Sequence, residues 1–140
     1  MKALIDTSVL VAAIVATEPF HAECDSLLDQ PEIGLYTHGL TEAFSTLTGG
    51  RKPFKMRPSL ASSLLEDDYV PFLTLVSLTP TETLRAMRDA EARGVRGGAI
   101  FDYLHLVAAR KTKARTLYTL NVAHFRAFHR PGDPEITHPS

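Results

Sequence analysis

Short apolar runs recur along the chain, and each has the length and composition of a buried β-strand. They cover residues 3–5, 33–37, 72–78 and 116–120, and a further extended piece is expected at residues 135–137. Runs of this kind, bounded by polar or turn residues, are typical of strands covered on both faces. Between them, apolar residues return at the three- to four-residue spacing of amphipathic helices. The alternation of strand and helix predicts an α/β fold with a parallel sheet.

The helices are expected at residues 9–15, 20–29, 38–49, 59–69, 80–93, 99–111 and 123–128. Thr79-Pro80-Thr81-Glu82 has the signature of a helix start, with proline at an early position. Gly49-Gly50 marks a helix end. The segment 99–111 is the strongest of the set, because its apolar residues form a stripe and basic residues in its last turn complement the helix dipole.

The size and composition indicate one globular domain spanning residues 1–140. Hydrophobic residues make up 44% of the chain and charged residues 22%, which argues against disorder. No apolar run approaches the roughly 20 residues that span a bilayer, and no signal-peptide pattern is present. We therefore expect no membrane association and a cytoplasmic location. The single Cys24 agrees, because it cannot form an internal disulfide.

The formal net charge of −1 conceals an uneven distribution of charge along the chain. Residues 1–48 carry seven acids and one base, whereas residues 93–130 carry eight bases and one acid. Between them, residues 51–57 contain four bases: Arg51, Lys52, Lys55 and Arg57. Each basic block alone could be a solvated surface. Together they also suit a surface that contacts phosphates locally.

Polar residues stand where strands end and helices begin. Asp6 follows the first strand, Glu42 lies near the second turn of the helix after the second strand, and Asn121 ends the fourth strand. Asp102 lies in the first turn of the helix at 99–111. Parallel strands would bring these four positions to one edge of the sheet, where α/β folds bind ligands. Asp6 taken alone could equally be a helix cap.

Asp102 has the least favourable surroundings of any acid in the sequence, because its neighbours Ile100, Phe101, Tyr103 and Leu104 are apolar or aromatic. A partly buried carboxylate requires a cation or hydrogen-bond donors. For Asp102, the sequence is consistent both with a salt bridge to a neighbouring arginine and with a functional role. Clustered carboxylates that repel one another imply a divalent cation, and oxygen ligands favour Mg²⁺ or Mn²⁺ over zinc. His105 and His124 are expected to pack or to face substrate, because no histidine has a zinc-site spacing.

Four segments in order carry a resemblance that covers nearly the whole chain: residues 5–8 (IDTS), 41–45 (TEAFS), 97–102 (GGAIFD) and 119–125 (TLNVAHF). The sequence resembles PIN-domain ribonucleases, and among them the VapC toxins of toxin–antitoxin pairs. The resemblance implies a three-layer α/β/α sandwich with a parallel five-stranded sheet. It also implies Mg²⁺- or Mn²⁺-dependent endonucleolytic cleavage of RNA, a small VapB-like antitoxin partner and a homodimer.

Carried over residue by residue, the resemblance gives Asp6, Glu42 and Asp102 as metal-binding and catalytic acids. Thr7, Ser8 and Thr119 become supporting hydroxyls. The fourth catalytic position, often Asp in the family, is Asn121 here, which puts a second metal in question. The RNA backbone would be held by basic residues, for which the candidates are Arg51, Lys52, Lys55, Arg57 and Arg96.

Two other functions compete with a ribonuclease. A haloacid-dehalogenase-like phosphatase also has an Asp after its first strand, but it needs a second Asp two residues later, where this chain has Ser8. The other is a metal-free, non-catalytic PIN-like module that binds RNA or protein. Only Asn121 favours that module, and the three remaining acids argue against it.

Overall fold

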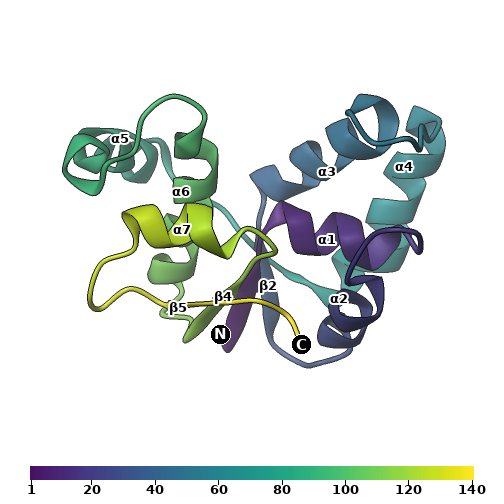
Figure 1. The fold of residues 1–140 in the computed structure, drawn as a ribbon, viewed down its shortest axis with the longest axis horizontal. Helices are drawn as coiled ribbons and strands as arrows, with labels where there is room; N and C mark the ends of the chain where they lie inside the picture. The colour runs from purple at the N-terminus through teal and green to yellow at the C-terminus, as the bar shows by residue number, and fades with distance from the viewer.

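Five short strands form one entirely parallel sheet in the computed structural model, which describes residues 1–140 (Figure 1). The order across the sheet is β3-β2-β1-β4-β5. The strands are β1 (Ala3–Ile5), β2 (Ile33–Tyr36), β3 (Thr74–Val76), β4 (Thr116–Tyr118) and β5 (Glu135–Thr137). The predicted parallel sheet is therefore confirmed, including the extended piece at the C-terminal end.

Seven α-helices cover the sheet: α1 (Thr7–Ile14), α2 (His21–Leu28), α3 (His38–Gly49), α4 (Pro58–Leu64), α5 (Pro80–Asp89), α6 (Ala99–Lys111) and α7 (Val122–Phe128). Three single turns complete the chain: η1 (Leu65–Tyr69), η2 (Val70–Phe72) and η3 (Glu91–Arg93). Helix α5 begins with the predicted signal, because Thr79 and Glu82 form a reciprocal capping box ahead of it. None of the helices is long and apolar enough to cross a membrane.

The two faces of the sheet pack into two separate hydrophobic cores. On β1, Ala3 and Ile5 face the core formed with α1, α2, α3 and α4, whereas Leu4 faces the core formed with α5, α6 and α7. All three side chains are buried, as expected for a strand covered on both faces. Figure 1 shows the helix groups on either side of the sheet, with their upper ends apart. This is the predicted α/β/α sandwich.

The strand order places a topological switch point between β1 and β4. From β1 the chain moves outward to β2 and β3, and it then returns to the other side of β1 to form β4 and β5. At such a point the connecting helices leave on opposite faces, so the carboxyl ends of the strands border an open crevice. Asp6 directly follows β1, and Thr119 directly follows β4.

The segment 58–78 is less regular than the sequence pattern predicts. The helix expected at 59–69 ends at Leu64 and continues as the π-type turn η1, and the strand expected at 72–78 is confined to Thr74–Val76. Pro71 limits how far the helix can continue, because it lacks the amide hydrogen that a further helical hydrogen bond needs. Val70 before it keeps helical backbone angles, whereas Tyr69 departs from them with φ −121° and ψ −49°. Phe72 belongs to the 3₁₀ turn around this proline.

Candidate active site

The carboxylate of Asp6 is buried at the junction of β1 and α1, with only 2% of the residue exposed. Its Oδ1 accepts hydrogen bonds from the Ser8 hydroxyl at 2.6 Å and from the Val9 amide at 3.2 Å. Its Oδ2 accepts a 2.6 Å hydrogen bond from the Thr119 hydroxyl. Asp6 is thus the N-cap of α1, but it also receives a donor from the far side of the switch point.

The same hydroxyl groups hold the end of β4 in place. Ser8 Oγ accepts a hydrogen bond from the Leu120 amide at 3.1 Å, and Thr119 Oγ1 accepts one from the Asn121 amide at 2.9 Å. Each hydroxyl therefore donates to Asp6 and accepts from the backbone after β4. The supporting hydroxyls Ser8 and Thr119 lie against Asp6, and they fix its carboxylate relative to both central strands.

Glu42 extends from α3 toward α6 and is linked to both α1 and α6. Its Oε1 accepts a hydrogen bond from the Thr7 hydroxyl at 3.1 Å and lies 2.9 Å from Nε2 of His105. Burial by itself would raise the pKa of Glu42. The hydrogen bond and charge of His105, followed by the Thr7 hydroxyl, outweigh burial and hold the pKa below its usual range.

His105 is the site residue that sequence reasoning underestimated. It is only 1% exposed, and its Nε2 contacts Glu42 while its Nδ1 has no hydrogen-bond partner. Its position three residues after Asp102 was the available signal, because such residues lie on adjoining parts of one helix face. The spacing could not reveal Glu42 as the partner, since the two residues are 63 positions apart in the sequence.

Asp102 lies half-buried in the first turn of α6 and forms no ion pair, so the arginine salt bridge considered from the sequence is absent. Burial raises the pKa of Asp102 and the charge of Asp6 raises it further, while His105 opposes the shift. Glu42 adds to the increase and His124 reduces it. The charges of Asp6 and Glu42 and of the two histidines therefore all act on the Asp102 carboxylate.

Two hollows flank the start of α6. One lies on the α3 side and is lined by His38, Thr41, Glu42, Ser45, Thr46 and Phe101. The other lies on the α7 side and is lined by Gly98, Ala99, Asp102, His124 and Phe128. Asn121, the N-cap residue of α7, is exposed, and its side chain makes no capping hydrogen bond.

The donor chemistry suits a hard divalent cation, although the cation site is not preformed. Asp6, Glu42 and Asp102 supply only oxygen atoms, and a cation would relieve the repulsion that raises the pKa of Asp102. No three acidic, histidine or cysteine side chains lie close enough together to hold a metal as they stand. Cation binding at these carboxylates would therefore require them to move closer together.

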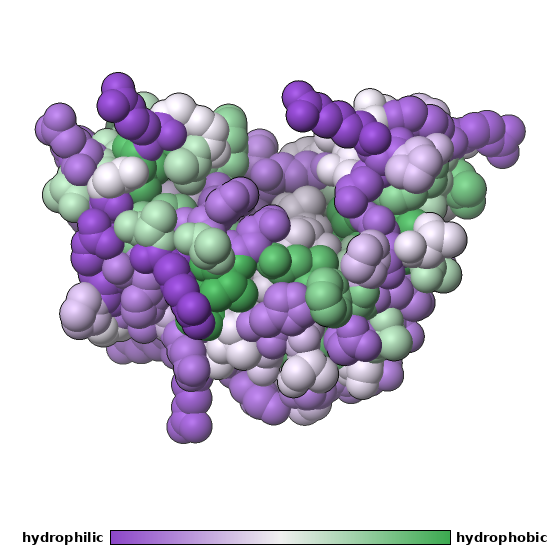
Figure 2. Space-filling model, viewed as in Figure 1, coloured by the Kyte–Doolittle hydropathy of each residue, from purple (hydrophilic) through white to green (hydrophobic).

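The predicted RNA-binding residues lie away from the carboxylates. Residues 51–57 connect α3 to α4 at the outer end of both helices, and Arg96 lies in the loop before α6 (Figure 1). Figure 2 shows hydrophilic side chains at both upper ends of the molecule with a hollow between them. All five of these residues are exposed. Lys52 forms a 2.8 Å ion pair with Glu18 and Lys55 donates to the Gly50 carbonyl, whereas the side chains of Arg51, Arg57 and Arg96 have no partner within the chain.

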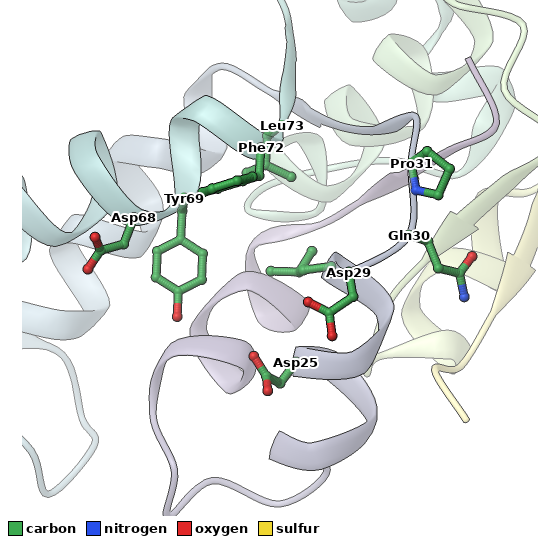
Figure 3. Close-up of a pocket in the computed structure, with 9 residues that line it drawn as sticks. Asp25, Asp29, Gln30, Pro31, Asp68, Tyr69, Phe72 and Leu73 are labelled. Carbon is green, nitrogen blue, oxygen red and sulfur yellow. The ribbon is translucent and has the colours of Figure 1, made fainter.

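The pocket drawn in Figure 3 is separate from this site. It lies between α2 and the η1–η2 turns, beside Pro31, which precedes β2 and therefore marks the amino-terminal edge of the sheet. Asp25, Asp29 and Asp68 line it together with Tyr69 and other residues. None of the predicted catalytic residues contributes to it. The carboxylate cluster at the opposite edge remains the candidate active site.

A protein-family model matches most of the chain. Residues 3–129 match the PIN domain, and the chain belongs to this family. Among curated relatives, Ribonuclease VapC27 of Mycobacterium tuberculosis is 31% identical over 110 residues, which are 79% of this chain and 78% of that protein.

Solved structures share the fold at lower sequence identity. The Mycobacterium tuberculosis toxin VapC20, described as cleaving the sarcin-ricin loop, has a TM-score of 0.71 at 16% identity, over 95% of this chain and all of that one. A chain of VapBC2 from Rickettsia felis, bound to a DNA fragment from its promoter, has a TM-score of 0.68 at 19% identity and full coverage of both chains.

The opposite pKa shifts of Asp102 and Glu42 predict opposite effects of neutralising each acid in metal-free buffer. Asp102→Asn removes a charge that folding disfavours, so we expect a Tm roughly a few degrees above wild type at pH 7. Glu42→Gln removes a charge that folding favours, so we expect a lower Tm. Thermal unfolding in EDTA measures both.

The pH dependence provides the check on this interpretation. The penalty at Asp102 exists above its raised pKa and vanishes below the ordinary carboxyl pKa, so the advantage of Asp102→Asn should disappear on acidification. The contribution of Glu42 is present above the ordinary pKa and is lost as the pH falls through its lowered value. Equal shifts of Tm in both variants at pH 7 would contradict the assigned electrostatics.

Proposed function

We propose that this chain is a divalent-metal-dependent endoribonuclease and the toxin of a VapBC-type toxin–antitoxin pair, acting in the cytoplasm. The observation that carries the proposal is the gathering of Asp6, Glu42 and Asp102 from β1, α3 and α6 at the β1–β4 switch point, with Asp102 left without a cationic partner. The name of the curated relative, a ribonuclease, supports the same activity.

In this proposal Asp6, Glu42 and Asp102 hold Mg²⁺ or Mn²⁺. Such a cation would polarise the scissile phosphate and lower the pKa of a bound water. Asp6 is the fixed ligand, because Ser8, Val9 and Thr119 restrain its carboxylate. Thr7 restrains Glu42. Asn121 offers a neutral amide that can accept a hydrogen bond from the attacking water or donate one to it, without adding charge.

The proposed RNA contacts form two groups, one after α3 and one before α6, on either side of the hollow in Figure 2. Arg51, Lys52, Lys55 and Arg57 follow α3, and Arg96 precedes α6, so an RNA backbone crossing the hollow would meet a basic group on each side. Arg51, Arg57 and Arg96 are the stronger candidates because Lys52 and Lys55 already have partners within the chain. Non-catalytic RNA binding by a metal-free module remains the competing function.

Metal-dependent cleavage distinguishes the enzyme from a binding module. We expect the purified chain to cleave RNA with Mg²⁺ or Mn²⁺ and to stop in EDTA. Asp6→Asn and Asp102→Asn should each reduce the rate by more than the roughly 10–100-fold that losing an outer-shell partner costs a metal site. Gel assays of labelled RNA measure the rates, with circular dichroism to confirm folding. Full activity in either folded variant would exclude the proposed site.

Asn121 tests how close the fourth position lies to the metal. Asn121→Asp adds a negative charge, and a pair at an effective dielectric of 20 is worth at most about 4 kcal/mol before desolvation and repulsion. We expect a smaller net gain, seen as a lower Mg²⁺ concentration for half-maximal activity. Superimposable Mg²⁺ titrations of wild type and Asn121→Asp would show that residue 121 is only a turn residue.

The proposed partner is a small VapB-like antitoxin that inserts basic side chains among the carboxylates. Several similar structures are toxin–antitoxin complexes, including VapBC from Salmonella typhimurium, with a TM-score of 0.68 and 16% identity. We also propose a homodimer, since α5 leaves Leu84 and Met87 exposed.

Expression of the chain alone should arrest growth, and co-expression of a small protein encoded beside it should restore growth. Colony counts after induction measure both effects. Asp102→Asn should be harmless at equal protein levels, because the arrest depends on cleavage. Arrest by Asp102→Asn, or failure of every adjacent small protein to relieve wild-type arrest, would contradict the toxin assignment.

A further inference from the structure

We propose that Phe101 is a stacking platform for an unpaired base of the RNA next to the cut, an inference that rests on the proposed ribonuclease function. Phe101 lies in the first turn of α6, directly before Asp102, and 49% of it is exposed. Consecutive helical residues point about 100° apart. Phe101 accordingly lines the hollow on the α3 side, while Asp102 lines the hollow on the α7 side.

The hollow beside Phe101 is lined by polar side chains except for Phe101 itself. Apart from His38, the residues that share its hollow are Thr41, Glu42, Ser45 and Thr46. Thr41 and Thr46 donate their hydroxyl hydrogens to carbonyls of their own helix, so their oxygens can still accept hydrogen bonds from a ligand. An aromatic ring beside hydroxyl groups matches a nucleobase, which has a flat face and polar edges.

A second aromatic ring lies beside Phe101 and nearly parallel to it. The imidazole of His38 lies 6.0 Å from the Phe101 ring, centre to centre, with only 10° between their planes. Tyr36 lies 6.0 Å from His38 and packs edge-on against His105 at 5.5 Å. His105 contacts Glu42, so a chain of aromatic contacts connects the platform to a proposed metal ligand. A base stacked on Phe101 would therefore be positioned relative to the carboxylates.

The ligand class follows from which bases expose their faces. In a double helix the base faces are stacked on one another, whereas unpaired bases can stack on an aromatic side chain. Such stacking tolerates any base, because each has a π-face. A protein segment fits this hollow less well, since one ring among hydroxyl groups offers little apolar area. The site therefore favours cleavage in single-stranded or looped RNA over cleavage in regular duplex.

The test measures binding separately from cleavage, with a short single-stranded RNA carrying 2-aminopurine at successive positions, in EDTA. Stacking quenches the fluorescence of 2-aminopurine, and fluorescein anisotropy gives Kd. Loss of one base–aromatic stack costs roughly 5- to 150-fold in Kd. We expect Phe101→Ala to weaken binding within that range and to lose quenching at one position, while Phe101→Tyr retains both.

Phe72→Ala is the matched control, because Phe72 is 72% exposed and lies in η2, away from the carboxylates. It should bind RNA as wild type does. A long RNA duplex should bind wild type and Phe101→Ala nearly equally, because all but its terminal base pairs are stacked on both faces. In Mn²⁺, Phe101→Ala should raise KM for single-stranded RNA more than it lowers kcat.

The outcomes separate this inference from the proposed function. If wild type cleaves RNA and Phe101→Ala has unchanged Kd and KM, the stacking role of Phe101 is wrong and the nuclease assignment is retained. If Phe101 affects binding and quenching but no divalent metal supports cleavage, the nuclease assignment fails and the platform stands. If Phe101→Ala loses affinity only because a dimer dissociates, as size-exclusion chromatography would show, the residue belongs to an interface between copies and the platform is wrong.

Discussion

The burial of the Asp6 carboxylate is the constraint on which the rest of the site depends. A buried charge is tolerated only when its oxygens receive strong donors, and leaving one unpaired costs several kcal/mol. Asp6 meets this requirement with two donors from its own helix start and one from Thr119, which is 113 residues away. The same requirement connects β1 to the end of β4, the two strands that border the switch point.

The remaining acids are placed by helices rather than by strands, and the consequences differ for each. Glu42 reaches across from α3 to a buried histidine of α6, which favours its charged form. Asp102 has no such partner, and its charge is disfavoured by burial and by the other two carboxylates. A carboxylate whose charge destabilises the fold, next to carboxylates that have hydrogen-bond partners, is typical of functional sites. In such sites, the protein gives up some stability in return for binding a ligand.

Charge and aromatic character are divided spatially around this acidic centre. The basic residues proposed to bind RNA lie at the outer ends of α3 and α4 and in the loop before α6, so in the proposed function they would hold phosphates without bringing arginines into contact with the carboxylates. The exposed ring of Phe101 lines the hollow on the α3 side of the acidic residues. This division allows one surface to attract a polyanion and still retain an acidic centre free for a cation.

The sequence by itself determined most of the elements and named the candidate residues of the site, because these depend on local periodicity and on residue type. The run at residues 3–5 followed by Asp6 could only be a buried strand that leads into a capped helix, and the strong stripe at 99–111 matches α6 (Ala99–Lys111). The tertiary structure alone decided the strand order, the hydrogen bond from Thr119 to Asp6 and the pairing of Glu42 with His105. It also decided the irregular turns around Pro71. Those features are contacts between residues far apart in sequence or compromises in packing, and no local pattern encodes which distant side chain will satisfy a buried polar group.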